Sequence, residues 1–329
     1  MHINFKRLTT TIATAALIAS SLAGCSTIAD YSRELTIVTH DSAVFSKQQL
    51  AEFKKETGIT VTQVKAGDAG AMTNKLVLTK SQPIGDLVYG IDNTFAGVAT
   101  DNKIIDGELR AIDFADVCMN YDKFWFSNKK TAAPTSIKDL TKPEFKNLTV
   151  IENPTTSSTG LSFLAATVSV FGADGWQEYW QALKSNGVKV TAGWEDAYFT
   201  DFSGSSGKGA YPIVLSYSSS PAYEVRTDGQ SQTASLLDAC YRQTEFAGVL
   251  ANAKNKSGAA KFIDFMLTPA FQKALPTSMY VYPVLAGVTL PTEWARFATV
   301  SDNPVGGELN VNVSRKDWFS EWSAIFNEN

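Results

Sequence analysis

The chain has 329 residues, of which 29 are basic and 33 acidic, giving a formal net charge of −4, and 44% of the residues are hydrophobic. This length predicts two domains or one bilobed protein, and the apolar fraction is sufficient to bury sizeable cores. The negative charge argues against nucleic acid and against anionic membrane surfaces as partners.

The N-terminus has the pattern of a bacterial export signal. Lys6 and Arg7 precede an uncharged run of apolar and small residues over 12–22, which is too short to span a bilayer comfortably. This run ends in Leu22-Ala23-Gly24-Cys25, which resembles the bacterial lipobox, whose cysteine takes a thioether-linked lipid. The alternative explanation of the segment is an ordinary buried helix that happens to contain a cysteine. We therefore predict a signal peptide over 1–24, lipidation of Cys25, a tether over 25–34, and anchoring at the outer or periplasmic face of the cell membrane.

Strand and helix patterns alternate along the rest of the chain. Residues 35–39 are rich in β-branched side chains and predict a strand. Ser46 is a candidate N-cap for the next helix, and Gly58 ends it. The remaining predicted strands are 59–64, 86–91, 148–151, 188–190 and 213–217, and the remaining helices are 72–79, 160–171, 174–185 and 259–267. This alternation predicts an α/β fold with mostly parallel sheets, in which two lobes face each other across a cleft.

Small hydroxyl residues gather directly after three predicted strands, in the segments 39–42, 153–160 and 217–223. Such residues satisfy the free N–H groups of a helix start, and they also bind polar groups of a ligand. Each segment alone is more simply explained as capping or turn chemistry. Three of them at corresponding places favour a binding cleft.

Aromatic residues occur in two loop-like segments, 193–198 with a tryptophan beside two acids, and 279–283 with two tyrosines before a proline. Their flat faces suit a planar or cationic ligand, each contact contributing roughly 0.5–2 kcal/mol. Any one of these aromatics could instead belong to the core. We assign Trp176 and Trp180, on a predicted amphipathic helix, to the core.

Two cysteines remain after Cys25. Cys118 and Cys240 are predicted to form a disulfide, because an exported chain meets an oxidising compartment; two unpaired buried thiols are the alternative. The sequence contains no cluster of metal ligands and no G-x-x-x-x-G-K-[S/T] motif. We therefore expect no metal and no cofactor, and the sequence offers no motif for binding ATP.

Together these segments resemble the periplasmic thiamine-binding proteins of ABC importers, a family of type II solute-binding proteins. The resemblance covers nearly the whole chain after Cys25. It rests on 39–42, 157–158, 193–198, 216–223, 261–272 and 282–284.

The resemblance implies a hinged, two-lobed protein that carries thiamine, or also its phosphates, to a permease driven by an ATPase, and that is a monomer and not an enzyme. Lobe 1 would be residues 35–118 and 246–329, with the chain end packing on either lobe, and lobe 2 residues 119–245. The implied ligand contacts are His40, Asp41, Ala69, Gly70, Ser157, Ser158, Trp194, Tyr217, Ser218, Ser219, Ser220, Tyr223 and Tyr280. The family often has Tyr in place of His40 and Trp in place of Tyr280.

Two alternatives remain open at this stage. Thiamine-cleaving enzymes share this fold and use a cysteine nucleophile, for which Cys118 is the candidate, although its sequence neighbours offer no evident base. The other alternative is a receptor for a different small cation, such as a polyamine.

Overall fold

A computed structural model describes residues 33–206 and 208–327. The predicted signal peptide, the lipidation site Cys25 and the tether up to residue 32 lie outside the described residues.

The described strands form one ten-stranded sheet in the order β2-β1-β3-β9-β4-β7-β5-β6, with β10 and β8 also paired to β4. The strands are β1 (Glu34–Thr39), β2 (Thr60–Lys65), β3 (Leu87–Asp92), β4 (Arg110–Asp122), β5 (Thr149–Glu152), β6 (Lys189–Thr191), β7 (Ile213–Tyr217), β8 (Thr233–Ser235), β9 (Tyr241–Val249) and β10 (Tyr282–Pro283).

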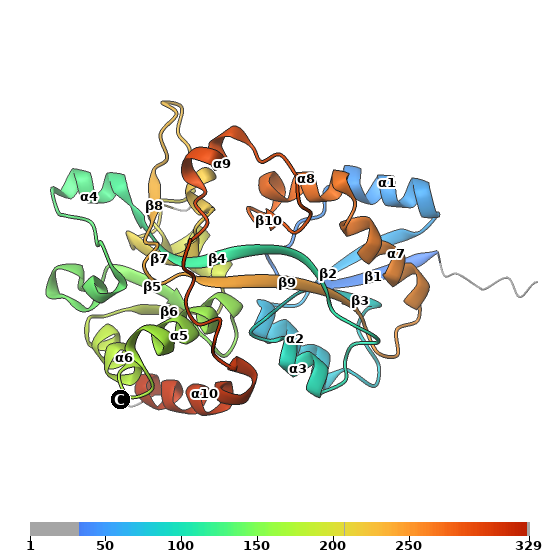
Figure 1. Ribbon diagram of the computed structural model, residues 1–329, viewed down its shortest axis with the longest axis horizontal. Helices are drawn as coiled ribbons and strands as arrows, with labels where there is room; N and C mark the ends of the chain where they lie inside the picture. The colour runs from blue at the N-terminus through green and yellow to red at the C-terminus, as the bar shows by residue number, and fades with distance from the viewer. Residues whose placement is uncertain (1–32, 207, 328–329) are drawn as a thin grey trace, which may run out of the picture. The chain divides into compact units, whose positions relative to one another are not determined.

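The sheet contains two groups of parallel strands. The first group is β2-β1-β3 and the second is β7-β5-β6. Between them run the long strands β4 and β9, which pair antiparallel with each other and cross the middle of Figure 1 side by side. The predicted lobe boundaries, after residues 118 and 245, both fall inside these two strands.

The helices begin and end at the local signals that the sequence carries. Ser46 caps α1 in a reciprocal capping box with Gln49, and Gly58 closes the helix at φ +74°. The helices are α1 (Lys47–Thr57), α2 (Ala69–Leu78), α3 (Ala96–Asp101), α4 (Lys123–Lys129), α5 (Ser158–Phe171), α6 (Trp176–Ser185), α7 (Lys256–Met266), α8 (Pro269–Ser278), α9 (Thr292–Phe297) and α10 (Val311–Asn327). Short turns η1 (Ile137–Thr141), η2 (Pro143–Phe145) and η4 (Ser220–Ala222) are 3-10, and η3 (Asp196–Asp201) is a π-helical turn.

The assignment of Trp176 and Trp180 to the core is confirmed, with 1% and 0% of each side chain exposed. The C-terminal helix α10 packs on α6, where Trp322 meets Trp180 edge to face with ring centroids 5.9 Å apart. It also contacts α3, through Asn312 and Asp101 among others. The chain end therefore touches helices from both groups of parallel strands.

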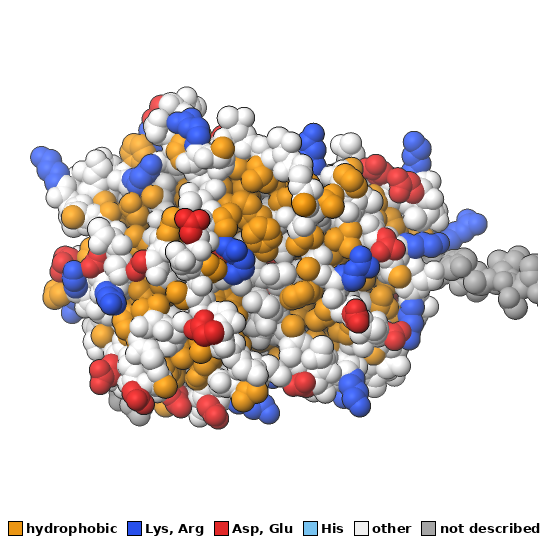
Figure 2. All heavy atoms as spheres, viewed as in Figure 1, with side chains coloured by type: hydrophobic (Ala, Val, Ile, Leu, Met, Phe, Trp, Pro, Cys, Tyr) orange, Lys and Arg blue, Asp and Glu red, His pale blue; other side chains and the backbone are white. Residues whose placement is uncertain are grey.

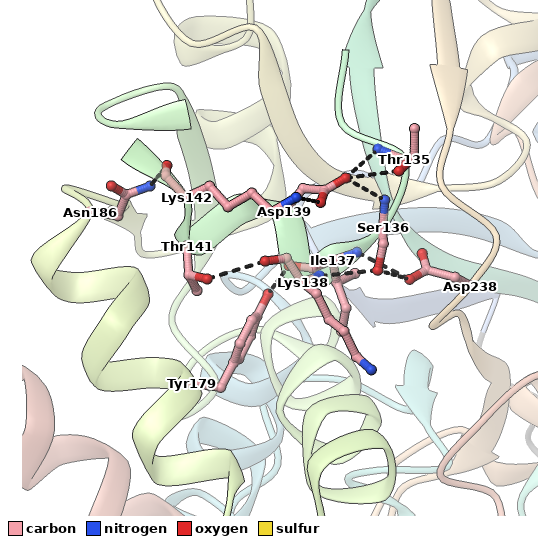
Figure 3. Close-up of polar contacts among 10 residues, drawn as sticks. All are labelled: Thr135, Ser136, Ile137, Lys138, Asp139, Thr141, Lys142, Tyr179, Asn186 and Asp238. Atoms are coloured by element: carbon pink, nitrogen blue, oxygen red, sulfur yellow. Dashed lines mark hydrogen bonds and ion pairs between the residues drawn. The ribbon is translucent and has the colours of Figure 1, made fainter. Parts of the chain in front are cut away.

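Polar contacts fix the segment that leads into β5 (Figure 3). Asp238 accepts hydrogen bonds from Ser136 Oγ (2.8 Å) and from the backbone N–H of Ile137 (3.1 Å), at the start of η1. The hydroxyl of Tyr179, on α6, donates to the carbonyl of Ile137 (2.8 Å). Because these bonds attach η1 to both α6 and the chain before β9, the entry to β5 is held on two sides.

Cys118 and Cys240 are joined in a disulfide in the structure. Cys118 lies in β4, and Cys240 immediately precedes β9, where Val117 pairs with Tyr241. The bond closes a loop of 122 residues. In the chain-entropy account, a loop of that size stabilises the folded state by roughly 4 kcal/mol.

Thiol counting tests this pairing. We expect the unfolded, unreduced protein to show no free thiol from Cys118 or Cys240, and reduction to release two. A double variant, Cys118→Ser with Cys240→Ser, should react like the unreduced protein and should melt earlier, because its unfolded chain is no longer constrained. Two reactive thiols before reduction would contradict the pairing.

The face drawn in Figure 2 carries charges of both signs, interspersed, with hydrophobic side chains gathered around β10 and α9. Val284, Leu285 and Leu290, between those two elements, are each exposed by more than a third. Within residues 33–206 and 208–327, no helix has the length and apolar character needed to cross a membrane.

Candidate functional site

The ends of strands from both parallel groups meet at one cavity. His40 follows β1, Trp194 follows β6, and Tyr217 ends β7. The cavity has a volume of about 250 Å³. Its lining is rich in rings and includes no Lys or Arg; the residues are His40, Ser42, Val44, Trp194, Glu195, Phe199, Tyr217, Tyr223, Glu245, Ser278, Met279, Tyr280 and Val281.

His40 and Glu245 form an ion pair in this cavity, with Nε2 and Oε2 3.5 Å apart. Both side chains are largely buried, at 13% and 8% exposed. No described atom makes a well-formed hydrogen bond to Nε2. Gly90, in β3, lets the imidazole lie this close to the sheet: its φ is +100°, and a Cβ there would stand 2.1 Å from His40 Cδ2.

Further buried carboxylates lie behind this pair. The hydroxyl of Tyr89 donates to Asp113 Oδ2 (2.5 Å), and burial together with the charge of Glu245 raises the pKa of Asp113 well above its usual range. Burial, opposed by hydrogen bonds from Thr94 and reinforced by Glu245, raises the pKa of Asp92 to about 7. The wall behind the cavity therefore contains carboxyl groups that hold their protons at a higher pH than usual.

Trp194 is fixed among other rings. Its indole stacks on Tyr198 with centroids 4.9 Å apart and an interplanar angle of 15°, and Phe199 meets it edge to face at 5.2 Å. The indole N–H donates to Ser216 Oγ (2.9 Å). These contacts fix the orientation of a large flat side chain that lines the cavity.

Tyr223 and Tyr280 form a second aromatic pair in the cavity lining, with ring centroids 4.2 Å apart. Tyr280 has φ +58°, a left-handed conformation that costs an aromatic residue on the order of 1–3 kcal/mol. Ser219 Oγ donates to the carbonyl of Tyr280 (2.5 Å) and so helps to hold it there. Tyr223 remains 43% exposed, so part of its ring is free to contact a ligand.

A second cavity, of about 230 Å³, shares Ser42, Trp194 and Glu195 with the first. Asp68 lies on its wall and connects three parts of the chain. Its carboxylate accepts from the backbone N–H groups of Ala69 (2.6 Å), Ser158 (3.3 Å) and Trp194 (2.9 Å) and from Ser157 Oγ (3.1 Å). Burial raises the pKa of Asp68, and these hydrogen bonds together with His40 oppose the shift.

The residues proposed from the resemblance fall into two sets. The first set lines the two cavities: His40, Trp194, Tyr217, Tyr223 and Tyr280 in the first, and Asp41 with Trp194 in the second. The second set is buried and lines neither of them: Ala69, Gly70, Ser157, Ser158, Ser218, Ser219 and Ser220. Among the second set, Ser220 Oγ accepts from the backbone N–H of Tyr217 (3.2 Å) and shares a hydrogen bond with Ser216, which in turn holds Trp194. Ser220 therefore helps to position Tyr217 and, through Ser216, Trp194.

Sequence reasoning missed Asp68, which accepts hydrogen bonds from three parts of the chain, and Glu245, the partner of His40. Asp68 follows β2 and carries a readable signal, because it is the N-cap of α2. Glu245 lies inside β9, a strand that the sequence analysis did not predict, and nothing in its local sequence marks it.

A further cavity, of about 490 Å³, lies elsewhere, around Thr36, Pro83 and Asn252. It has no aromatic lining and includes none of the residues proposed above. No group of three or more His, Cys, Asp or Glu side chains suited to a metal ion was found among the described residues.

Residues 79–303 match the family model described as bacterial extracellular solute-binding protein. The chain is also 31% identical to the thiamine-binding periplasmic protein of Escherichia coli (strain K12), over 88% of this chain and 92% of that protein. The chain belongs to the bacterial extracellular solute-binding protein family.

Solved structures of solute-binding proteins agree with this assignment. A periplasmic thiamin binding protein superposes with a TM-score of 0.76 at 28% identity, covering 90% of this chain and 96% of the other. AfuA from Actinobacillus pleuropneumoniae, solved with fructose-6-phosphate, gives a TM-score of 0.75 at 14% identity over 90% and 99% of the two chains, which bears on the fold alone. The predicted fold class of this solute-binding protein is thereby confirmed.

Proposed function

We propose that this chain is the substrate-binding component of a bacterial ABC importer and that its ligand is thiamine. The observation that carries the proposal is the cavity at the strand ends, which combines six ring-bearing side chains with two carboxylates and has no Lys or Arg in its lining. The related protein from Escherichia coli is named for thiamine binding.

Thiamine matches this lining in shape and in charge. It joins a flat pyrimidine to a thiazolium ring with a fixed positive charge. Aromatic faces such as those of Trp194 and Tyr223 attract both rings by stacking, and the thiazolium also by cation–π interaction. Glu245 and Glu195 supply negative charge where that cation would lie. A polyamine would use the carboxylates and could make cation–π contacts, but it has no flat ring to stack on these faces.

We infer that the chain binds its ligand without transforming it. An enzyme of the thiamine-cleaving kind would need a free thiolate at Cys118. Here Cys118 Sγ is bonded to Cys240, and only 1% of the residue is exposed. Because of this disulfide, Cys118, the candidate nucleophile named from the sequence, has no free thiol.

Calorimetry of the purified protein against four probes tests the ligand. We expect thiamine to bind one to one, spermidine to bind at least tenfold more weakly, and ferric iron not to bind; thiamine monophosphate shows whether the phosphate esters share the site. Tighter binding of spermidine than of thiamine would replace the proposal with its polyamine alternative.

We further propose that the two groups of parallel strands act as lobes, 35–118 with 246–329 and 119–245, that close on the ligand. We propose that the protein is an exported monomer, held at the membrane by lipid on Cys25, and that it delivers thiamine to a permease and its ATPase. The support for export is the N-terminal sequence pattern together with relatives named as periplasmic.

The anchor can be tested with Cys25→Ser, a change that removes the thiol that would carry the lipid. We expect the variant to lose its lipid and to leave the membrane fraction, while its thiamine affinity stays the same because the described fold begins after this position. Cys118→Ser, which removes a different thiol, serves as the control and should remain with membranes. A Cys25→Ser protein that still carries lipid refutes the anchor.

A further inference from the structure

His40 is the one ring of the cavity that can carry a positive charge, and it lies where a cationic ligand would bind. It directly follows β1, lines the cavity together with Trp194 and Tyr280, and pairs with Glu245 at 3.5 Å. Gly90 lets β3 approach the back of the imidazole so closely that the ring has no room to retreat. The imidazole and a bound cation would therefore share one carboxylate.

The groups that face His40 are mostly acidic. Glu245 comes from β9, Asp113 from β4 and Asp68 from the start of α2, and the phenol of Tyr89 on β3 lies with its ring 5.9 Å away. Glu195, Tyr217, Tyr223 and Tyr280 share the cavity with it. Lys65 is exposed and donates a hydrogen bond to the backbone carbonyl of Asp41, the residue after His40.

This environment keeps the imidazole charged in the empty site. Burial by itself lowers the pKa of His40, but Glu245 foremost, then Asp68 and Asp113, more than offset it and raise the pKa to about 9. In the free protein near neutral pH, His40 is therefore an imidazolium that neutralises Glu245.

We propose that a cationic ligand takes over the role of this imidazolium, so that thiamine binding expels one proton from His40 into solvent. This inference rests on the proposed function. No covalent bond other than the N–H bond breaks: the imidazolium becomes a neutral imidazole, the proton goes to buffer, and the net charge of the site is unchanged. A neutral ring is also the better stacking partner for a cation.

The size of the effect follows from Coulomb's law. A unit charge about 6 Å from the imidazolium, at an effective dielectric constant of about 20, weakens proton binding about a hundredfold. At pH 8 roughly 0.8 proton should then be released per thiamine. Because the neutral form of His40 binds better, affinity should rise with pH, about fivefold from pH 7 to pH 8, and should level off above pH 9.

Calorimetry in phosphate and in Tris at one pH measures the released proton, because the two buffers differ in their heats of protonation. Each measurement is made on the wild-type protein and on His40→Tyr, which keeps a flat ring but carries no charge. We expect the variant to bind thiamine with no proton release and with an affinity that is flat between pH 7 and pH 8.5.

The outcomes separate this inference from the function on which it rests. Thiamine binding without proton release, or equal release in His40→Tyr, overturns the role of His40 and leaves the ligand assignment intact. Equal release would instead point to another buried acid near the cavity, such as Asp113, whose pKa burial and Glu245 raise well above its usual range. Failure of both proteins to bind thiamine overturns the proposed function and this inference with it.

Discussion

Replacing Trp194 with alanine is expected to lower thiamine affinity about tenfold to a hundredfold, because a stacked aromatic at a desolvated contact contributes roughly 1–3 kcal/mol of binding free energy. Some stability should also be lost, since the indole stacks on Tyr198 and donates to Ser216. Trp194→Phe keeps a ring and removes only the N–H donor, so it should retain more of the affinity. Titration calorimetry and thermal melting on each variant give the two quantities separately.

Trp180→Ala is the matched control. This tryptophan is fully buried, is not part of the cavity lining, and packs against Phe163 and Trp322. Its loss should cost about 3–5 kcal/mol of stability and leave thiamine affinity unchanged in the protein that remains folded. If Trp194→Ala behaves in the same way, melting early and binding thiamine normally, then Trp194 belongs to the core and the aromatic site is wrong.

A single methyl group at Gly90 is expected to disturb both stability and binding. Gly90→Ala places a Cβ at φ +100°, 2.1 Å from His40 Cδ2, where β3 already shifts register against β9. Strained backbone and steric overlap together should cost about 2–4 kcal/mol of unfolding free energy. The imidazole must also leave Glu245, so thiamine affinity should change as well. Denaturant unfolding and calorimetry measure the two effects.

Gly107→Ala isolates the contact from the strain. Gly107 has a similar φ of +86°, but nothing lies within 4 Å of its Cβ position. We expect this variant to lose only about 1 kcal/mol and to bind normally. Combining Gly90→Ala with His40→Ala should return stability to the level of Gly107→Ala, because the clashing ring is gone. Equal losses in the two single variants would show that His40 does not press on β3.

The elements with clear local signals were predicted from the sequence, whereas the long strands β4 and β9 were not. The strand 213–217 and the helix between Ser46 and Gly58 are confirmed at those bounds, because β-branched residues and caps act over a few neighbours. β4 gave no such signal. It is buried along most of its length, and Asp113 and Asp116 inside it are both fully buried. Asp116 is satisfied by Arg242 of β9, 126 residues away, which no local pattern reveals.

In the candidate site, too, some features could be predicted from the sequence and others could not. The rings and serines near strand ends could be predicted because their positions repeat a known family pattern. Their separate roles could not, because those depend on which side chain faces the cavity. Ser219 and Ser220 look like ligand contacts in sequence, yet they hold Tyr280 and Tyr217 in place. The role of Glu245 becomes visible only once β9 pairs with β3 in the folded sheet, since its partner His40 is 205 positions earlier in the sequence.

The antiparallel strands β4 and β9 connect the two groups of parallel strands and so limit how these groups can move. β4 and β9 are hydrogen-bonded to each other and each continues into one group of parallel strands, β4 through β7 and β9 through β3. Sliding one group past the other would break at least one of these three ladders, whereas bending or twisting β4 and β9 together can keep all three. We therefore propose that the two groups move relative to each other by a hinge and not by shear. The bond between Cys118 and Cys240 ties β4 to the start of β9, so we expect these two strands to turn as one ribbon.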